Sequence, residues 1–245
     1  MRVWKRAAAL AVAALAAVTL AACSAASEAP SSDDAGAGIV KDAPTYNSER
    51  TFVDAPDAQP LTLDAQGWWA MDSYVDYGIK VTNPNAAYTA CNTQVQVTLY
   101  DENDQVAGTY TQTINEVGPG QTIGFAGEVG DGWAPARVEV ALAPASTQWG
   151  DGADWTAPIT IDSCSEEDKL YFRYELSGDL TNHTDVYIAN VGLSALLYDE
   201  NGNIVAGYPA RAYKIKAGQT KSYLQTIDSA PSHARVELYA QVTDE

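Results

Sequence analysis

Histidines, the side chains that most often act as general bases or metal ligands near neutral pH, are scarce in this sequence, which has two among 245 residues. His183 lies between Asn182 and Thr184 and close to Asp185, in a composition typical of a loop. A histidine near an aspartate suggests a catalytic triad or a metal site, but neither it nor His233 belongs to a His-Glu-x-x-His or Gly-x-Ser-x-Gly motif. We therefore predict no catalytic residue. Hydrolysis by two carboxylates needs no motif and stays open as the less favoured alternative.

Oxygen-bearing side chains gather in two short segments and raise the question of a cation site. Asp101 and Asn103 lie in one segment, and Asp199 and Asn201 lie in the other. Carboxylate and amide oxygens are the ligands that calcium prefers. Each segment also falls between two predicted strands, where Asp and Asn form turns by bonding to their own backbone. We favour turns, predict no metal or other cofactor, and keep calcium as the alternative.

Tryptophans are the third group that could carry function, because an exposed indole can stack on a sugar or anchor a protein partner. The candidates are Trp68, Trp133, Trp149 and Trp155. Trp68 precedes Trp69, and adjacent residues of a strand face opposite sides, so one is expected in the core and one at the surface. Trp133, Trp149 and Trp155 lie in Gly- and Asp-rich stretches typical of loops. Packing between domains is the alternative that we favour for Trp149 and Trp155.

The N-terminus has the pattern of an export signal. Residues 1–6 carry three positive charges, residues 7–20 are almost purely apolar, and small residues lead to Cys23. The tetrad Leu20-Ala21-Ala22-Cys23 resembles the bacterial lipobox, which implies that the chain is cut before Cys23 and that its thiol carries lipid. We predict a signal peptide over residues 1–22 and a lipid anchor on Cys23 at the extracytoplasmic face of the cell membrane. A secretory signal with an unmodified cysteine is the alternative.

The charge of the chain limits its partners. Loss of residues 1–22 leaves 11 Lys and Arg against 32 Asp and Glu, a net charge of −21. Such a chain does not bind nucleic acid through its phosphates and is repelled by anionic lipid head groups. The membrane is therefore expected to be reached through the lipid alone.

Two cysteines remain once Cys23 carries lipid. Cys91 and Cys164 are expected to form a disulfide, because the exported compartment is oxidising and exposed thiols are reactive there. This bond would join the two halves of the chain and fix the angle between them. Two buried thiols are the alternative.

The mature chain repeats itself after a polar lead-in. Residues 23–59 are rich in Ser, Ala, Asp, Glu and Pro and predict a disordered tether that becomes partly ordered near its end. Beyond it, short segments recur at a constant offset of 98 residues. The recurring pairs are Leu99-Tyr100-Asp101-Glu102-Asn103 with Leu197-Tyr198-Asp199-Glu200-Asn201, Gly120-Gln121-Thr122 with Gly218-Gln219-Thr220, and Ala136-Arg137-Val138-Glu139 with Ala234-Arg235-Val236-Glu237. Two homologous domains follow, at residues 60–157 and 158–245.

Both repeats are predicted to be all-β. Apolar and polar residues alternate in segments such as 94–100, where Val95, Val97 and Leu99 share one face. Turn residues separate the segments, and Asn201-Gly202 is the clearest hairpin signal. Several short strands with such turns indicate antiparallel β-sandwiches.

The segments at 97–101 and 195–199, each followed by Glu-Asn and a turn, resemble the FxLYD domain, with Val97 or Ala195 in place of its phenylalanine. Phe125 and Tyr223 fit as core aromatics after the Gly-Gln-Thr step. The resemblance covers both repeats and implies immunoglobulin-like sandwiches in an exported, non-enzymatic protein. It supplies no catalytic residues.

These features together predict a lipid-anchored protein of the cell envelope that is not an enzyme and presents a binding surface to a protein or a glycan. A structural spacer or envelope-assembly component without a ligand of its own is the alternative.

Overall fold

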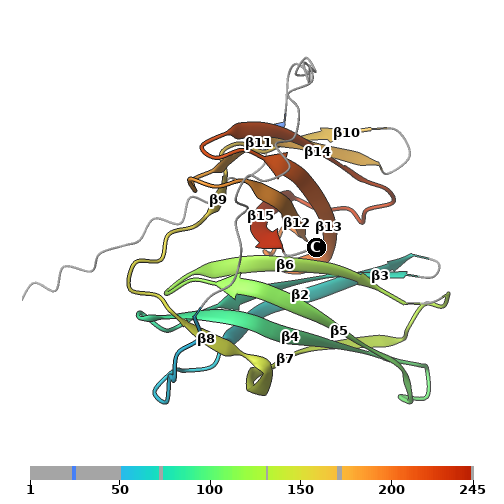
Figure 1. The fold of residues 1–245 in the computed structure, drawn as a ribbon. Helices are drawn as coiled ribbons and strands as arrows, with labels where there is room; N and C mark the ends of the chain where they lie inside the picture. Colours follow the sequence, from blue (N-terminus) through green and yellow to red (C-terminus); the bar gives the residue numbers. More distant parts are fainter. Residues whose placement is uncertain (1–23, 26–50, 72–73, 131, 170–172, 244–245) are drawn as a thin grey trace, which may run out of the picture.

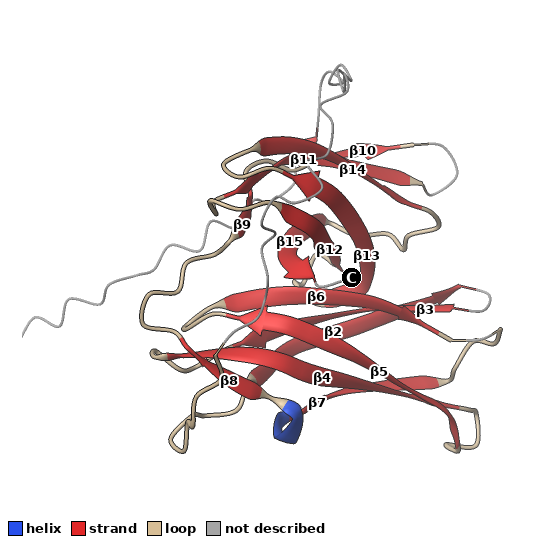
Figure 2. Ribbon diagram, viewed as in Figure 1, coloured by secondary structure: helices blue, strands red, loops and turns tan. Residues whose placement is uncertain are grey.

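The computed structural model describes residues 24–25, 51–71, 74–130, 132–169 and 173–243, and it is built almost wholly from β-strands (Figures 1 and 2). The one helix in these ranges is the short 3-10 turn η1 (Pro144–Ser146). None of the helical structure described is long and apolar enough to cross a bilayer. The predicted all-β class is confirmed, whereas the predicted signal peptide and Cys23 lie outside the described residues.

The first sandwich uses the first predicted repeat. Its strands are β2 (Thr62–Met71), β3 (Tyr74–Thr82), β4 (Tyr88–Tyr100), β5 (Val106–Val117), β6 (Thr122–Val129), β7 (Arg137–Ala143) and β8 (Gln148–Asp151). They form one sheet in the order β2-β3-β6 and a second in the order β5-β4-β7, with β8 also paired to β4. Every pairing in these two sheets is antiparallel.

The second sandwich repeats this plan. Its strands are β9 (Ile159–Ile161), β10 (Ser165–Asp168), β11 (Tyr174–Asn182), β12 (Ile188–Tyr198), β13 (Ile204–Ile215), β14 (Thr220–Ile227) and β15 (Arg235–Thr243). One sheet has the order β10-β11-β14 with β9 on β11, and the other has the order β13-β12-β15. The two-residue β1 (Ser24–Ala25) pairs with β10 in parallel.

Alternation of side chains explains why these segments are strands. In β4, Val95, Val97 and Leu99 are buried while Gln94 and Gln96 are exposed, so one face of the strand covers a core and the other faces water. Strands β4 and β12 occupy the same place in the two repeats, and both have a register shift within the Leu-Tyr-Asp segment. The shift falls between Leu99 and Tyr100 in β4 and between Leu197 and Tyr198 in β12. The two sandwiches therefore share local irregularities as well as strand order.

The end of the predicted tether lies against the first sandwich. Phe52 forms an isolated bridge with Gly150, and Val53 donates its N–H to the Trp149 carbonyl at 2.8 Å. Gln59 and Asn85 then exchange two hydrogen bonds of 2.8 Å each. Residues 51–59 are thus an ordered lead-in held along β8 and the β3–β4 loop.

The two sandwiches pack face to face in four layers, which Figure 1 shows one above the other. The sheets β10-β11-β14 and β5-β4-β7 are the outer layers, and β13-β12-β15 lies on β2-β3-β6 between them. Leu196, Tyr198, Ile204 and Tyr239 of the second sandwich accordingly belong to the hydrophobic cluster of the first. Broad packing, and not a short linker alone, sets the angle between the domains.

Candidate functional site

Glycines allow the two inner sheets to approach closely. A Cβ built on Gly207 of β13 would lie 2.5 Å from the Gly78 Cα and 2.5 Å from the Tyr77 carbonyl oxygen. A Cβ built on Gly78 would meet a methyl group of Leu196 at 2.6 Å, and one on Gly124 would meet the Tyr239 ring at 2.3 Å. Because the clash at Gly207 is with backbone, a larger residue there would separate the sheets.

One buried carboxylate organises the polar part of this interface. Glu237 of β15 accepts hydrogen bonds from Tyr198 and Tyr239 at 2.8 and 2.7 Å, and Lys80 of β3 lies 3.3 Å away across the interface. Arg235 also bonds to it and stacks 3.8 Å above the centre of the Tyr198 ring. Burial by itself raises the pKa of Glu237, but the two hydroxyls and Lys80 outweigh it and hold that pKa at about 2.

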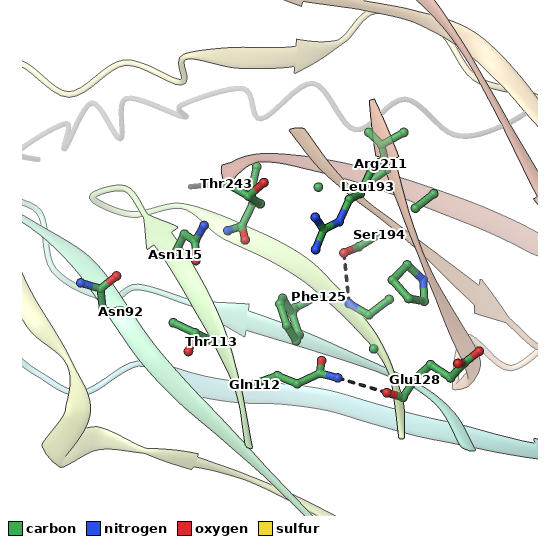
Figure 3. A pocket seen from close by; sticks show the side chains of 16 residues that line it. Asn92, Gln112, Thr113, Asn115, Phe125, Glu128, Leu193, Ser194, Arg211 and Thr243 are labelled. Atoms are coloured by element: carbon green, nitrogen blue, oxygen red, sulfur yellow. Dashed lines mark hydrogen bonds between the residues drawn. The ribbon is translucent and has the colours of Figure 1, made fainter. Parts of the chain in front are cut away.

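A polar groove of about 790 Å³, shown in Figure 3, lies between the two sandwiches. Phe125 lines it from β6, Ser194 lines it from β12, and Arg211 lines it from β13. The Ser194 hydroxyl accepts the Ala126 N–H at 3.1 Å, so an edge group of β6 is satisfied by the other domain. Glu128 is the one carboxylate among the described residues that line this groove.

Two amide side chains close one end of the polar groove. Asn115 of β5 donates to the Val242 carbonyl at 3.3 Å, and Gln241 of β15 donates to the Glu116 carbonyl at 2.6 Å. Each side-chain amide thus bonds to a backbone carbonyl of the opposite domain. The carbonyl that Asn115 contacts belongs to the residue after Gln241, and the one that Gln241 contacts belongs to the residue after Asn115. Each of these side chains thus uses one of its two amide N–H donors at the interface.

A second hollow, which we call the tryptophan groove, has a volume of about 780 Å³. Its lining residues come from β2, β7, the start of β13 and the loop before β15: Gln66, Gly67, Trp68, Trp69, Val138, Ile204, Val205, Pro231 and Ser232. Most of these side chains are apolar. None of the lining residues is charged, so the groove suits an apolar group of a partner.

Asp76 of β3 lies on the same face of the inner sheet as the residues that approach the second domain. Its cross-strand neighbours are Trp69 on β2 and Glu128 on β6. Burial and the nearby Glu128 charge raise the pKa of Asp76 to about 7. Asp76 in turn contributes to the raised pKa of Tyr208 on β13, after burial of the phenol itself. The buried Tyr208 hydroxyl has no hydrogen-bond partner within the described residues.

The four candidate tryptophans do not form a common surface. Trp68, Trp133 and Trp149 are half-buried and pack against the first core, and Trp149 also meets Tyr88 edge-on. Trp155 covers Gly118 and donates its indole N–H to Glu116, within the first domain. These contacts lie within the first domain, and packing of Trp149 and Trp155 between the domains stays a prediction. Trp68 is the only one of the four that lines either described groove.

Trp69, adjacent to Trp68, is the tryptophan that reaches the surface. Its exposed fraction is 38%. The expected alternation of a core and a surface indole on this strand is present, with the candidate Trp68 on the core side. The sequence does not show which of the two indoles faces outward, because alternation places adjacent residues on opposite faces of a strand without indicating which face covers the core.

The two acidic segments are hairpin turns. The Asp101 carboxylate accepts the N–H groups of Asn103 and Gln105 at 2.8 Å each. These bonds, that from Gln105 first, hold the pKa of Asp101 below its usual value. Asp104 adopts a left-handed φ of 59° and bonds to Arg137 at 2.6 Å.

The counterpart segment has the same geometry. Asp199 accepts the N–H groups of Asn201 and Asn203 at 2.9 and 2.8 Å, and the Asn203 side chain is the main cause of its lowered pKa. Gly202 supplies the positive φ of 82°. The described residues contain no cluster of three metal-ligating side chains. Local turn bonds account for Asp101 and Asp199, and Asn103 and Asn201 contribute backbone donors.

The expected disulfide between Cys91 and Cys164 is not formed. Cys91 lies in β4, where its thiol is 3.8 Å from the Thr89 carbonyl oxygen. Cys164 is buried in the second core, directly before β10. The strands β4 and β10 belong to the two outer layers, so two sheets separate these cysteines. Sheets pack about 10 Å apart, beyond the 4.4–6.8 Å between Cα atoms that a disulfide requires.

Both histidines make contacts that suit structural roles. His183 shares a 2.8 Å hydrogen bond with Thr160 of β9. His233 lies 2.7 Å from Glu166 of β10 and 2.9 Å from the Pro231 carbonyl. Burial lowers the pKa of His233, but Glu166 and the Pro231 carbonyl outweigh it and raise that pKa. Neither histidine lines either described groove.

The interface residues were the main omission of the sequence analysis, although a signal exists. In the first repeat the segment Val97-Thr98-Leu99 alternates, whereas the second repeat has Ala195-Leu196-Leu197 without a polar residue. A strand without alternation is buried on both faces. Leu196 is indeed fully buried and points to the first sandwich.

Comparisons with known proteins give only a distant likeness. No protein family and no curated protein matches the chain. Among solved structures, a Bacteroides uniformis β-glucuronidase 2 matches at a TM-score of 0.27 and 14% identity, over 71% of this chain and 25% of that one. A putative β-galactosidase from Bacteroides fragilis matches at 0.20 and 14%, over 71% and 30%. The N-terminal CBM22-1-CBM22-2 tandem domain from Paenibacillus barcinonensis matches at 0.16 and 9%, over 80% and 88%.

The chain spans about a quarter of the length of the first of these enzymes. TM-scores this low carry no argument about what the chain binds or does. The fold is defined by its own strands, which make it a protein of two tandem antiparallel β-sandwiches packed into one four-layer unit.

Proposed function

We propose that this protein is a non-enzymatic, lipid-anchored component of the cell envelope that presents a binding surface to a protein or glycan partner, with the tryptophan groove as that surface. Export and attachment through Cys23 rest on the N-terminal sequence. The resemblance of both repeats to FxLYD domains supports the same kind of exported protein.

The observation that carries the proposal is the exposed Trp69 in a groove lined mostly by apolar side chains. A tryptophan at 38% exposure beside Val205 and Pro231 offers a large rigid contact on an otherwise acidic surface. Such an indole, partly shielded by neighbours, is typical of the residues that dominate binding energy at interfaces. The scarcity of hydrogen-bonding groups in the groove favours a protein segment over a sugar as its occupant.

Two features support binding without catalysis. Glu128 is the one carboxylate among the described residues that line the polar groove, and the tryptophan groove has none; Asp76, the cross-strand neighbour of Glu128, lines neither groove. The two histidines are engaged elsewhere by Thr160 and Glu166.

A spacer without a ligand is the second candidate, and the closed four-layer packing favours it. Two sandwiches that bury a common face make a stiff unit able to hold a tethered partner at a distance. The two candidates differ in whether the tryptophan groove is occupied in the envelope.

Site-specific crosslinking tests the proposal. The chain from Ser24 onward, with a photoreactive residue at Ser232 in the tryptophan groove, is incubated with envelope extract and illuminated. We expect one dominant adduct that disappears when Trp69→Ala is combined with the probe. The exposed indole contributes to binding and little to the core, so this variant should keep its unfolding midpoint within a few degrees.

A probe at Leu224, on the far outer sheet and 65% exposed, is the matched control. Adducts shared by both positions, or an adduct at Ser232 that survives Trp69→Ala, would contradict the proposal. Absence of any adduct at Ser232 would favour the spacer.

A further inference from the structure

Three side chains form a row across the inner sheet β2-β3-β6 of the first sandwich. Trp69 of β2 pairs with Asp76 of β3, and Asp76 pairs with Glu128 of β6. Cross-strand partners lie on the same face of a sheet, with Cβ atoms about 4.5–5.5 Å apart. We call these three residues the indole–carboxylate row.

This row lies beside the edge of the second sandwich. A Cβ built on Gly67 of β2, or on its partner Gly78 of β3, would meet backbone atoms of β13. The row lies two residues away on each strand, on the same face and about 6.7 Å further along. Lys80, two residues from Gly78 in the other direction, contacts β15. Of the described strands, β13 pairs with β12 alone, so the row extends past the edge strand of the docked sheet. Trp69 reaches the tryptophan groove and Glu128 the polar groove (Figure 3).

The two carboxylates of the row have no counter-charge from the described residues. Neither Asp76 nor Glu128 forms a side-chain hydrogen bond or an ion pair within the described part of the chain. Glu237, at the covered end of the same interface, has Lys80 and two tyrosine hydroxyls, and its pKa is about 2. Asp76 is half-buried, and burial with the nearby Glu128 raises its pKa to about 7. Because buried charges are normally paired, the row has the place and the charge for a cation supplied by a partner.

We propose that the indole–carboxylate row binds a basic side chain, arginine or lysine, of the protein segment that occupies the tryptophan groove. The inference rests on the proposed function and names the chemistry of the partner. A guanidinium or ammonium group can stack on the exposed indole of Trp69 and donate hydrogen bonds to the carboxylates beside it. The groove itself has no charged lining residue, so apolar side chains of the same segment would fill it.

Selection of peptides tests this inference. The chain from Ser24 onward is immobilised at pH 8, above the pKa of Asp76, and a phage library of random dodecapeptides is selected on it. We expect the enriched peptides to combine apolar residues with arginine or lysine and to lose binding to Trp69→Ala. The most enriched peptide, made synthetically, should bind the double variant Asp76→Asn and Glu128→Gln at least tenfold more weakly, because both carboxylates become neutral. Citrulline or acetyl-lysine in place of its basic residue should weaken binding to the unmodified chain by a similar factor, and binding to the double variant by less than twofold.

The double variant Glu102→Gln and Asp154→Asn removes the same charge from exposed positions of the first sandwich and is the matched control. It should bind the peptide within twofold of the unmodified chain. Equal weakening by the two double variants would show general attraction to an acidic protein and would overturn the inference. Peptides that need Trp69 but lack a basic residue would overturn it and leave the proposed function intact. A selection without any Trp69-dependent peptide would overturn it as well, and the crosslink at Ser232 judges the proposed function separately.

Discussion

At the scale of single residues, the repeats place the same side chains in opposite environments. Tyr100 bonds to Glu139 at 2.9 Å and lies under Arg137, as Tyr198 does with Glu237 and Arg235. Glu139 is exposed, whereas Glu237 is buried between the domains. A motif that is a surface ion pair in one copy therefore becomes the polar centre of an interface in the other, because the second copy is covered.

Asp76 provides a pH test of that interface. Its pKa is raised from 3.8 to about 7 by burial and by Glu128, so the folded state keeps a proton that the unfolded state loses between these values. The free energy of unfolding should therefore fall as pH rises through this window. Asp76→Asn, which stays neutral, should match the unmodified protein near pH 4 and exceed it above pH 7, by at most about 4 kcal/mol.

Urea denaturation of both proteins between pH 4 and pH 9 measures this difference. Asp154→Asn, at an exposed position of the first domain, is the control and should follow the unmodified curve. A constant difference between Asp76→Asn and the unmodified protein at all pH values would show that Asp76 titrates normally.

At the scale of elements, β4 and β12 show how a repeated strand acquires a second buried face. Both strands send alternate residues into their own core, and β12 also sends Leu196 and Tyr198 to the other domain. The change from Thr98 to Leu196 at corresponding positions converts a half-exposed strand into one buried on both faces. Leu196 and Gly207, where the first repeat has Thr98 and Thr109, thus distinguish the docked sheet from the exposed one.

Leu196→Thr should therefore weaken the whole molecule. We expect it to lower the free energy of unfolding by about 2–4 kcal/mol, as for removal of a buried leucine that leaves a polar group unpaired. The mirror variant Thr98→Leu, on a face that no described sheet covers, should change stability by less than about 0.5 kcal/mol. Urea denaturation of the two variants checks this, and equal effects would mean that the interface adds no stability.

At the scale of the whole molecule, four stacked sheets form one body, and none of the residues that line its tryptophan groove is charged although the chain has a formal net charge of −18. The tryptophan groove lies at the junction of the sandwiches, with lining residues from both of them. A lipid on Cys23 would hold this body at the membrane, since its charge opposes direct contact with anionic lipids.

Removal of the anchor should release the protein. In cells expressing Cys23→Ala, we expect the protein in the soluble fraction and without label from radioactive palmitate, because each buried CH₂ of the lipid contributes about 0.8 kcal/mol to membrane attachment. Cys91→Ala, a change within β4, is the control and should remain labelled and in the membrane fraction. Membrane retention of the Cys23→Ala protein would exclude the lipid as the sole anchor.

The sequence alone determined the all-β class, because alternation in segments such as 94–100 and turn residues such as Asn201-Gly202 are local properties. The constant offset of 98 residues likewise indicates the repeat from the sequence alone. Only the tertiary structure decided that the repeats stack through Leu196, that Cys91 and Cys164 lie in different outer layers, and that Trp69 faces outward. These facts depend on which sheet packs against which. Such packing brings together residues that are far apart in the chain, and no local sequence pattern specifies which of them meet.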